Sequence, residues 1–494
     1  MRNDTSAIST VSGKDFADSI HRLADSLDGI RRYTEAFRTH LEEESQSFIS
    51  RYGMAAIPFF LLDFYRDVKD LPKNDQRCTE FDQMRNRAQS LMGPAMAIDY
   101  AKGAIRVVID EPKLIETVKH VKKRKQEISA ELRLLHEGAL ILAIAYVEVL
   151  ASSLLSCDFH LYPNKLADQG SFTLKHLEQF SSVAEARQQL IDNSIDSTLR
   201  DQVNKWIETI KAAYNLRTAY LDNSTSTLRE IFARRNVIVH NGGVANRRYI
   251  SQLEGSPETL IGRRLNVGPD YLATALDRLE VSFVLLGAQC WDKAIRDDKE
   301  AIAELLNQIA YRALLASRWE VARTLSKFAA SDESVSESTR IIARFNYWQA
   351  CKWLDEFEDI RAEIELLDGN AYRDRFKLGW FALLDRQNEF FETLSAALAS
   401  GEIAPWEANE WPIFRELRKL PRFQEVLSAV AAWEPVVTLD SEAVNDILKK
   451  ARQREKETTT SEAGADEQLS IADDVGVKVE SVGEVQTDST TPNS

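Results

Sequence analysis

Cysteine is scarce in this 494-residue sequence, and its four copies lie far apart: Cys78, Cys157, Cys290 and Cys351. They form no CxxC pair, which argues against a zinc site or a disulfide framework. The same usage favours a reducing, cytoplasmic compartment. Glycine-rich phosphate loops, a serine nucleophile elbow and an HExxH pair are also missing. We therefore expect no metal and no cofactor.

Positive charge is in deficit as well. The formal net charge is −15, and residues 451–494 carry ten acids against four bases. The rest of the chain is therefore still acidic, by about −9. A polyanionic partner would be repelled by this overall field, so it must be met by a local basic surface. The polar first sixteen residues also lack the apolar stretch of a signal peptide.

Long hydrophobic runs are rare, and the exception is residues 138–156, GALILAIAYVEVLASSLLS. The run is nearly long enough to span a bilayer. Glu148 lies inside it, two serines follow, and no second span exists. A helix that is apolar on all sides is also typical of the centre of a large domain. We expect a buried helix and no membrane contact.

The remaining patterns are almost entirely helical and predict an all-α fold. Apolar residues recur at helical spacing over 17–45, with Thr34 as the one polar gap. A basic run at 119–126 leads into a helix reaching about 156, and 270–295 is a second long apolar helix. We expect four regions. These are an N-terminal helical region (1–118), a central domain (119–298), a region of helical pairs (299–450) and a disordered acidic tail (451–494).

The third region resembles tetratricopeptide (TPR) helical hairpins, which repeat about every 34 residues. Three segments can be overlaid so that Trp319, Phe357 and Asn388 correspond. Residues 411–427, WPIFRELRKLPRFQEVL, resemble the closing helix of such arrays. A plain helical bundle is the alternative. Either arrangement favours an interaction module, so a protein partner is expected here.

One stretch carries chemical content, RRNVIVHNGG at 234–243. A T-x-x-E capping box at Thr227 predicts where its helix begins, and the two glycines predict where it ends. On a helical wheel, Ile231, Phe232, Ile238 and Val239 form a buried stripe.

The two arginines of this stretch fall at different places on the wheel. Arg235 lies in the middle of the stripe, so its guanidinium needs an anionic partner, whereas Arg234 lies outside it and is expected to be solvated. Asn236 and His240 are four residues apart and share a face, where an amide can orient the imidazole for proton transfer. Arg235 and His240 point about 140° apart, so one copy makes a poor joint site and two copies across a dimer make a better one.

These residues are similar to the R-x4–6-H motif of the HEPN superfamily (higher eukaryotes and prokaryotes nucleotide-binding). Arg235 matches the arginine, Asn236 the polar residue that follows it, and His240 the histidine. The context is also similar, with a long apolar helix bearing a lone acid, Glu148, then intervening helices, and a closing helix after the motif. The resemblance covers residues 130–295.

The resemblance implies a metal-independent endoribonuclease that works as a homodimer through this domain. His240 would act as general acid or base, Arg235 would stabilise the phosphorane, and Asn236 would hold the imidazole. The products would be a 2′,3′-cyclic phosphate and a 5′-hydroxyl. Glu148 is a supporting acid that would pair with Arg235 before RNA arrives. Its alternative role is that of a core acid satisfied by another base.

RNA delivery requires further cations near the motif. The candidate contacts are Arg234, Arg247, Arg248 and Tyr249, with Arg263, Arg264 and Lys122–Lys125 as other basic groups. Tyr249 either stacks on a base or packs inside the fold. The family's common setting suggests a toxin or antiviral defence effector. The alternative function is a non-catalytic scaffold in which the HEPN-like domain dimerises and the TPR-like region binds a protein.

Overall fold

The computed structural model describes residues 11–68, 71–72, 75–92, 96–101, 104–109, 112–168, 170–253, 258–367 and 373–430. These residues form an all-α fold, as the sequence predicts. The chain divides into two compact units, Met1–Val426 and Leu427–Ser494, and the account below concerns the first. The expected acidic tail, 451–494, lies outside the described residues, as do residues 431–450 of the expected hairpin region.

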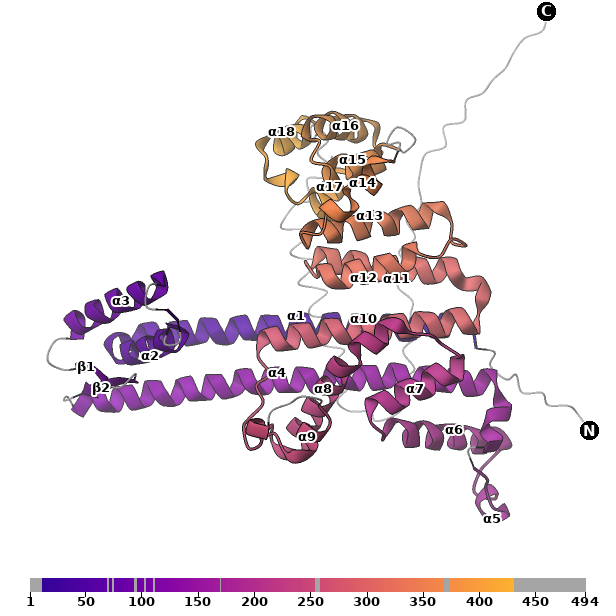
Figure 1. Ribbon diagram of the computed structural model, residues 1–494, viewed down its shortest axis with the longest axis horizontal. Helices are drawn as coiled ribbons and strands as arrows, with labels where there is room; N and C mark the ends of the chain where they lie inside the picture. Colours follow the sequence, from indigo (N-terminus) through magenta and orange to yellow (C-terminus); the bar gives the residue numbers. More distant parts are fainter. Residues whose placement is uncertain are drawn as a thin grey trace, which may run out of the picture. The chain divides into compact units, whose positions relative to one another are not determined.

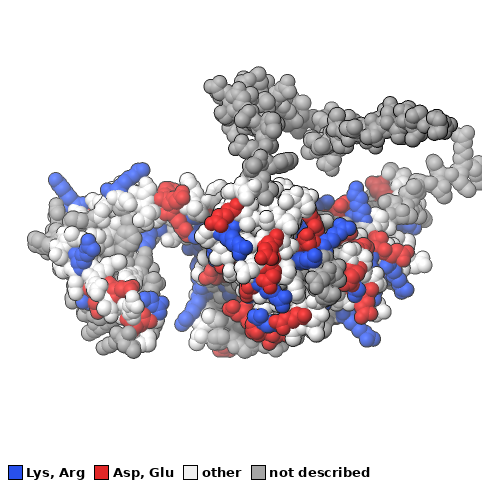
Figure 2. Space-filling view, turned by 90° about the horizontal axis from the view of Figure 1, so that it is seen from above, with Lys and Arg blue, Asp and Glu red and all other residues white. Residues whose placement is uncertain are grey.

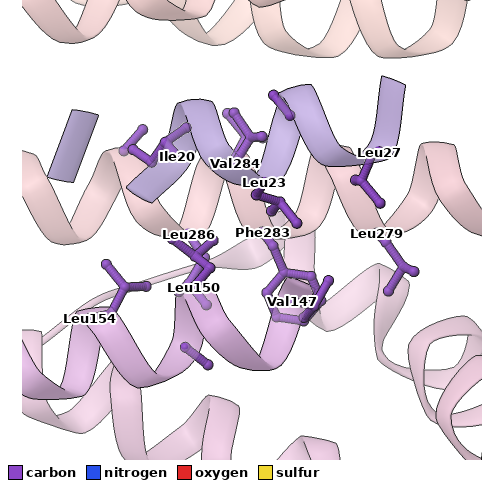
Figure 3. Close-up of a cluster of buried hydrophobic side chains, with 14 of the residues drawn as sticks. Ile20, Leu23, Leu27, Val147, Leu150, Leu154, Leu279, Phe283, Val284 and Leu286 are labelled. Carbon is purple, nitrogen blue, oxygen red and sulfur yellow. The ribbon is translucent and has the colours of Figure 1, made fainter. Parts of the chain in front are cut away.

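Three long helices form the centre of the first unit: α1 (Gly13–Tyr52), α4 (Pro112–Leu161) and α10 (Pro269–Ala294), which pack along one another (Figure 1). Their apolar residues interlock in one core, seen in Figure 3, formed by Ile20, Leu23, Leu27, Val147, Leu150, Leu154, Leu279, Phe283, Val284 and Leu286. Gly287 permits this approach, because an added Cβ would lie 2.8 Å from Ile20 Cγ1. The apolar run of α4 is therefore a central helix.

α4 is also long and apolar enough, by length and composition, to cross a membrane. Half of its most apolar window is nevertheless buried inside the protein. The exposed half leaves a row of apolar side chains on its outer face, including Leu134, Leu142 and Val149.

The shorter helices of the central region cover α4 and α10. They are α5 (Leu174–Leu177), α6 (Val183–Leu199), α7 (Val203–Tyr214), α8 (Ala219–Asn241) and α9 (Arg247–Ser251). Trp206 on α7 anchors this layer. Its ring stacks on Phe283, with 5.6 Å between ring centroids, and packs edge-on against Phe232, with 5.8 Å between ring centroids. Burial of such large rings contributes much of the packing energy of a core.

The N-terminal region contains a short β-hairpin that was not predicted from the sequence. Its elements are η1 (Gly53–Ala56), α2 (Ile57–Val68), α3 (Gln76–Met92), β1 (Met96–Ala101) and β2 (Ala104–Ile109). The strands are antiparallel, with Met96 opposite Ile109 and Ala101 opposite Ala104. The boundary expected at 118 falls inside α4, and α1 belongs to the central core instead of a separate region.

Three helical hairpins follow α10, in agreement with the expected helix pairs. They are α11 (Lys299–Leu315) with α12 (Trp319–Ala330), α13 (Glu337–Trp353) with α14 (Glu358–Glu365), and α15 (Asp374–Leu383) with α16 (Gln387–Ser400). α11 and α12 share the core of the central helices. The expected boundary at 298 therefore separates two sets of elements but not two cores.

The turns of these hairpins repeat, and they correct the predicted overlay. Each turn contains a non-glycine residue with positive φ, namely Ser317 (58°), Asp355 (60°) and Asp385 (57°). The residue after each donates its N–H to the carbonyl five residues earlier, which is the helix-ending bond expected at such a turn. These turns make Trp319, Phe357 and Gln387 equivalent. The overlay that chose Asn388 is wrong by one residue.

The closing segment is not one helix. Residues 411–427 contain two 3₁₀ turns, η7 (Pro412–Phe414) and η8 (Leu417–Lys419), after α17 (Pro405–Glu410) and before α18 (Pro421–Val430). Pro412 and Pro421 each stand at the first position of their element, because proline fits a helix start and interrupts a helix interior.

Candidate functional site

The helix that carries the motif, α8, begins at Ala219, so the start predicted at Thr227 is wrong. Threonine and glutamate three residues apart also occur inside helices, so the pattern alone does not fix a boundary. The predicted end is confirmed. Gly242 and Gly243 have φ of 58° and 81°, and the Gly243 N–H donates to the carbonyl of Val237 at 3.1 Å. Two left-handed residues in succession end a helix most easily at glycine.

α8 is buried on two sides, whereas the wheel indicated one. Ile231, Phe232 and Ile238 join the central core as predicted, but Val239 is 49% exposed. Ala233 and Val237 pack on the other side, in a second cluster completed by the segment that folds back after the glycines: Ala245, Tyr249 and Leu265. The face left open is a narrow strip that carries Asn236, Val239 and His240.

Arg234 is enclosed, which overturns the expectation that it is solvated. Its Nε donates to Glu230 at 2.7 Å, its Nη1 donates to the carbonyl of Asn266 at 2.5 Å, and its guanidinium lies 4.0 Å from the ring centre of Tyr271. Glu230 also accepts the hydroxyls of Tyr249 at 2.7 Å and Tyr271 at 2.6 Å. This cluster ties α8 to α9 and α10, so it leaves little of Arg234 for an RNA contact.

Arg235 has the anionic partner that its position requires. Its Nη2 donates to Glu148 of α4, and its Nη1 donates to Asn236 Oδ1 at 3.1 Å. Its Nε is buried and has no hydrogen-bond partner among the described residues. Burial raises the pKa of Glu148 above its ordinary value, and the charge of Arg235 opposes that rise. The predicted pairing of Glu148 with Arg235 is confirmed.

A cavity of about 640 Å³ brings the motif residues together. Glu148, Arg235, Asn236 and His240 all line it. Arg235 and His240 of one copy thus line the same cavity, although their Cβ directions differ by about 140°. The Nη1 of Arg235 donates to Asn236 Oδ1, so the angle between Cβ directions does not fix where the charged ends lie. Cavities of this size are typical of small-molecule and nucleotide-sized ligands.

Asn236 does not hold the imidazole of His240, contrary to expectation. Its Oδ1 accepts from Arg235, and the His240 ring, which is exposed, has no hydrogen bond to any residue that the structure describes. Both ring nitrogens are therefore available to a ligand in the cavity.

The expected RNA contacts separate into three kinds. Arg248 is exposed and lines the cavity, whereas Arg247 is exposed but does not line it. Tyr249 also contributes to the lining, but it is only 3% exposed and donates its hydroxyl to Glu230, which favours the packing role. Burial raises the pKa of Tyr249 to about 12.

Several lining residues had no signal in the sequence. One wall of the cavity is the end of α6 and the start of α7, which contributes Asp196, Arg200, Asp201 and Gln202. Only the tertiary fold brings this turn to α8. Asn246, also in the lining, was readable as a helix start, because its side chain accepts the N–H of Tyr249 at 2.9 Å.

Two of the basic groups outside the cavity are paired with acids. Arg124, in the run at 122–125, contacts Glu44, Glu127 and Glu131, and Arg264 contacts Glu137 at 3.4 Å. On the face shown in Figure 2, Lys and Arg side chains alternate with Asp and Glu. The described residues contain no group of three or more His, Cys, Asp or Glu side chains that could hold a metal ion.

Comparison of the chain with protein-family models, with curated proteins and with solved structures finds no match. The cavity and the residues that line it are therefore the features that indicate a function.

Proposed function

We propose that this protein is a metal-independent endoribonuclease of the HEPN type, and that the cavity beside α8 is its active site. The observation that carries the proposal is that Arg235, Asn236, His240 and Glu148 line one cavity. An arginine, a histidine and a carboxylate are the groups that phosphodiester transfer needs when no metal supplies charge. A role as a toxin or antiviral defence effector follows from the resemblance alone.

The reaction proposed is attack of a ribose 2′-OH on the adjacent phosphorus. Arg235 binds the non-bridging oxygens and stabilises the charge of the phosphorane, because a guanidinium offers paired donors to phosphate geometry. His240, with both ring nitrogens unengaged, transfers a proton at the 2′-OH or at the 5′-oxygen that leaves. The products are a 2′,3′-cyclic phosphate and a 5′-hydroxyl. The substrate is single-stranded RNA, since a duplex fixes the ribose away from in-line geometry.

The contacts of Arg235 support binding of a phosphate by exchange. Glu148 occupies Nη2, and the neighbouring Nε has no partner among the described residues. A phosphate that displaces the carboxylate from Nη2 gains Nε as well and binds through two parallel hydrogen bonds. Glu148 thus protects the charge of Arg235 in the free protein, and the substrate offers that arginine a better partner.

The test compares wild type with His240→Ala on total RNA in the presence of EDTA, with mapping of the cleaved ends. We expect cleavage with cyclic-phosphate ends in wild type and a loss of roughly 10²–10⁴-fold in the variant. His176→Ala is a matched control, because His176 is exposed on α5, away from the cavity lining. Equal cleavage by wild type and His240→Ala, or none by wild type under all activating conditions, would overturn the proposal.

The homodimer forms through the outer face of α4 in this proposal. The outer α4 stripe, exposed or half-buried throughout, repeats every seven residues and consists of Leu135, Gly138, Leu142, Ala145, Val149 and Ser152. An antiparallel pairing about a two-fold axis between Leu142 and Ala145 places a large residue opposite a small one in every layer. Leu135 meets Ser152, Gly138 meets Val149, and Leu142 meets Ala145. Such alternation allows two helices to approach closely.

This pairing also suits the active site. A two-fold axis perpendicular to α4 keeps the same flank of each helix on the same side of the dimer. Glu148 lies on the flank toward α8, and a rise of about 1.5 Å per residue puts it about 7 Å along α4 from the axis. Both cavities would therefore open on one side of the dimer, where one RNA strand reaches both.

Gly138→Leu tests the dimer surface without disturbing the monomer. A Cβ at Gly138 meets nothing within 4 Å, so the folded monomer accepts the change. We expect a dimer for wild type and a monomer for the variant in sedimentation velocity, because the added side chain collides with Val149 of the other copy. Gly29→Leu on α1 is the matched control, since its Cβ also meets nothing within 4 Å. A wild-type monomer, or a variant that still dimerises, would contradict this surface.

A second candidate function is a non-catalytic scaffold, which the three helical hairpins with their repeated turns favour. In that case Arg235 and Glu148 are structural, and a protein partner binds the hairpins. Arg235→Ala distinguishes the two. The scaffold predicts lower thermal stability with partner binding intact, whereas the nuclease predicts near-normal stability with cleavage lost.

A further inference from the structure

Glu148 has a position that pairing with Arg235 alone does not explain. It is the acid within the apolar run of α4, its side chain is 32% exposed, and it faces the cavity. Arg235 is its one hydrogen-bond partner among the described residues. Burial raises its pKa above the ordinary value. A carboxylate in this state is poorly solvated, and it remains beside the cavity when its partner changes.

The other charged groups around the cavity form no ion pair with Glu148 in this conformation. They are His240 on α8, Arg248 on α9, and Asp196, Arg200 and Asp201 at the wall formed by α6 and α7. Asp201 pairs with Lys205 at 3.3 Å, and Asp196 and Arg200 are exposed at the rim. Loss of Arg235 to a phosphate would therefore leave Glu148 half-buried and unpaired, which makes its carboxylate a stronger base.

We propose that Glu148 is the general base of the cleavage reaction, with His240 as the general acid. The inference rests on the proposed function and assigns the two proton transfers that the function leaves open. The substrate phosphate takes Arg235, and the freed carboxylate accepts the proton of the ribose 2′-OH. One protomer then holds a complete set, which consists of the base on α4 with the acid and the phosphate-binding arginine on α8.

The step balances without any other reactant. The 2′-oxygen forms a bond to phosphorus while the bond from phosphorus to the 5′-oxygen breaks. The 2′-OH proton moves to Glu148, and the imidazolium of His240 gives its proton to the departing 5′-oxygen. The enzyme is left with a protonated Glu148 and a neutral His240, and exchange with water restores both. The different surroundings of the two groups, one half-buried and one exposed, favour this division of roles.

A substrate with a bridging sulfur in place of the 5′-oxygen separates the roles. Sulfur leaves without protonation, so an enzyme that lacks its general acid recovers on this substrate, whereas one that lacks its base does not. On ordinary RNA, which has oxygen at this position, we expect His240→Ala and Glu148→Gln each to cleave roughly 10²–10⁴-fold more slowly than wild type. On the sulfur substrate His240→Ala should approach wild type and Glu148→Gln should not. Asp192→Asn, which neutralises an exposed carboxylate on α6 outside the cavity lining, is the control for lost charge.

The pH profile and binding distinguish a base from a protective partner of Arg235. Removal of the base in Glu148→Gln should abolish the rise of the cleavage rate with pH on the acidic side of the profile. A 2′-O-methyl RNA, which cannot react, should bind Glu148→Gln at least as well as wild type. Faster cleavage by Glu148→Gln, an unchanged acidic limb, or rescue of Glu148→Gln instead of His240→Ala by sulfur would overturn the inference. If His240→Ala is inactive while Glu148→Gln is not, only this inference fails. If His240→Ala cleaves like wild type, the proposed function fails.

Discussion

Glu280 and Glu148 lie on long helices of the same bundle, and each pairs with arginine from another element. Glu280 on α10 is fully buried, and its Oε2 contacts Arg318 and, at 2.8 Å, Arg31. Those arginines also contact Asp28, at 3.0 Å from Arg31 and 2.9 Å from Arg318. Among the described residues, Glu148 pairs with Arg235 alone, and about a third of its side chain is exposed, at the cavity.

The difference separates charges that hold elements together from charges that are free to exchange partners. The cluster around Glu280 joins α1, α10 and the turn before α12, so it fixes the first helical hairpin to the bundle. Its arginines are 17% and 10% exposed, against 22% for Arg235, and neither of them lines the cavity. The Glu148 pair borders the cavity. Buried donors without a hydrogen-bond partner among the described residues occur in both places, at Arg235 Nε and at Arg31 Nε and Arg318 Nε, so access to the cavity is what distinguishes the two. Perturbed groups of the second kind are the ones that indicate function.

Neutralising the two glutamates should give the largest contrast. Glu280→Gln leaves two enclosed arginines short of a counter-charge, so we expect the free energy of unfolding to fall by about 3–5 kcal/mol. Glu148→Gln should change it by no more than about 1 kcal/mol, because that pair is partly exposed to solvent. Urea denaturation of both variants measures the difference. Equal losses would mean that the Glu148 pair is also a structural contact.

Arg235→Lys should affect chemistry and spare stability. A lysine keeps the positive charge but loses the paired donors that fit a phosphorane, so we expect cleavage to slow by roughly 10²–10³-fold. The melting temperature should stay near that of wild type, since Lys still pairs with Glu148. Arg318→Lys is the matched variant at the structural cluster. It should lower the melting temperature and leave the cleavage rate of the folded protein unchanged, and the reverse pattern would contradict the assignment.

The neighbouring Arg234 belongs with the structural group despite its place in the motif. Arg234→Ala removes a hydrogen bond to Glu230, another to Asn266, and the stacking on Tyr271. We expect a loss of about 2–3 kcal/mol in unfolding free energy, from charged hydrogen bonds and a half-buried cation–π contact. Chemical denaturation compares it with Arg235→Ala, which should lose less. A larger loss for Arg235→Ala would reverse the roles of the two arginines.

The sequence predicted the parts of this picture that depend on local periodicity. The spacing of apolar residues identified α1, α4 and α10, and the place of Arg235 on a buried stripe required the anion that Glu148 supplies. The errors arise where distant segments decide the environment. Ala245, Tyr249 and Leu265 bury a second side of α8, and Asn266 and Tyr271 enclose Arg234. The α6–α7 wall of the cavity and the β-hairpin likewise depend on contacts that no helical period encodes.

The smallest predicted effect decides which force governs Glu148 in the free protein. Burial raises its pKa and Arg235 lowers it, with burial the larger cause. Between the ordinary pKa of a glutamate, about 4.3, and the raised pKa of Glu148, the folded state binds more protons than the unfolded state. The contribution of Glu148 to the free energy of unfolding therefore falls as pH rises through this window, and it stays constant above the raised pKa.

The stability of wild type relative to Glu148→Gln should accordingly decline as pH rises from 4 to 7, in urea titrations at each pH. A difference that grows with pH would mean that Arg235 stabilises the carboxylate more than burial destabilises it. Glu148 would then be a committed ion-pair partner like Glu280, and a phosphate would have to break a favourable contact to reach Arg235. A decline means that the cost of burial outweighs the pairing with Arg235, so the ionised pair adds no net stability to the folded protein.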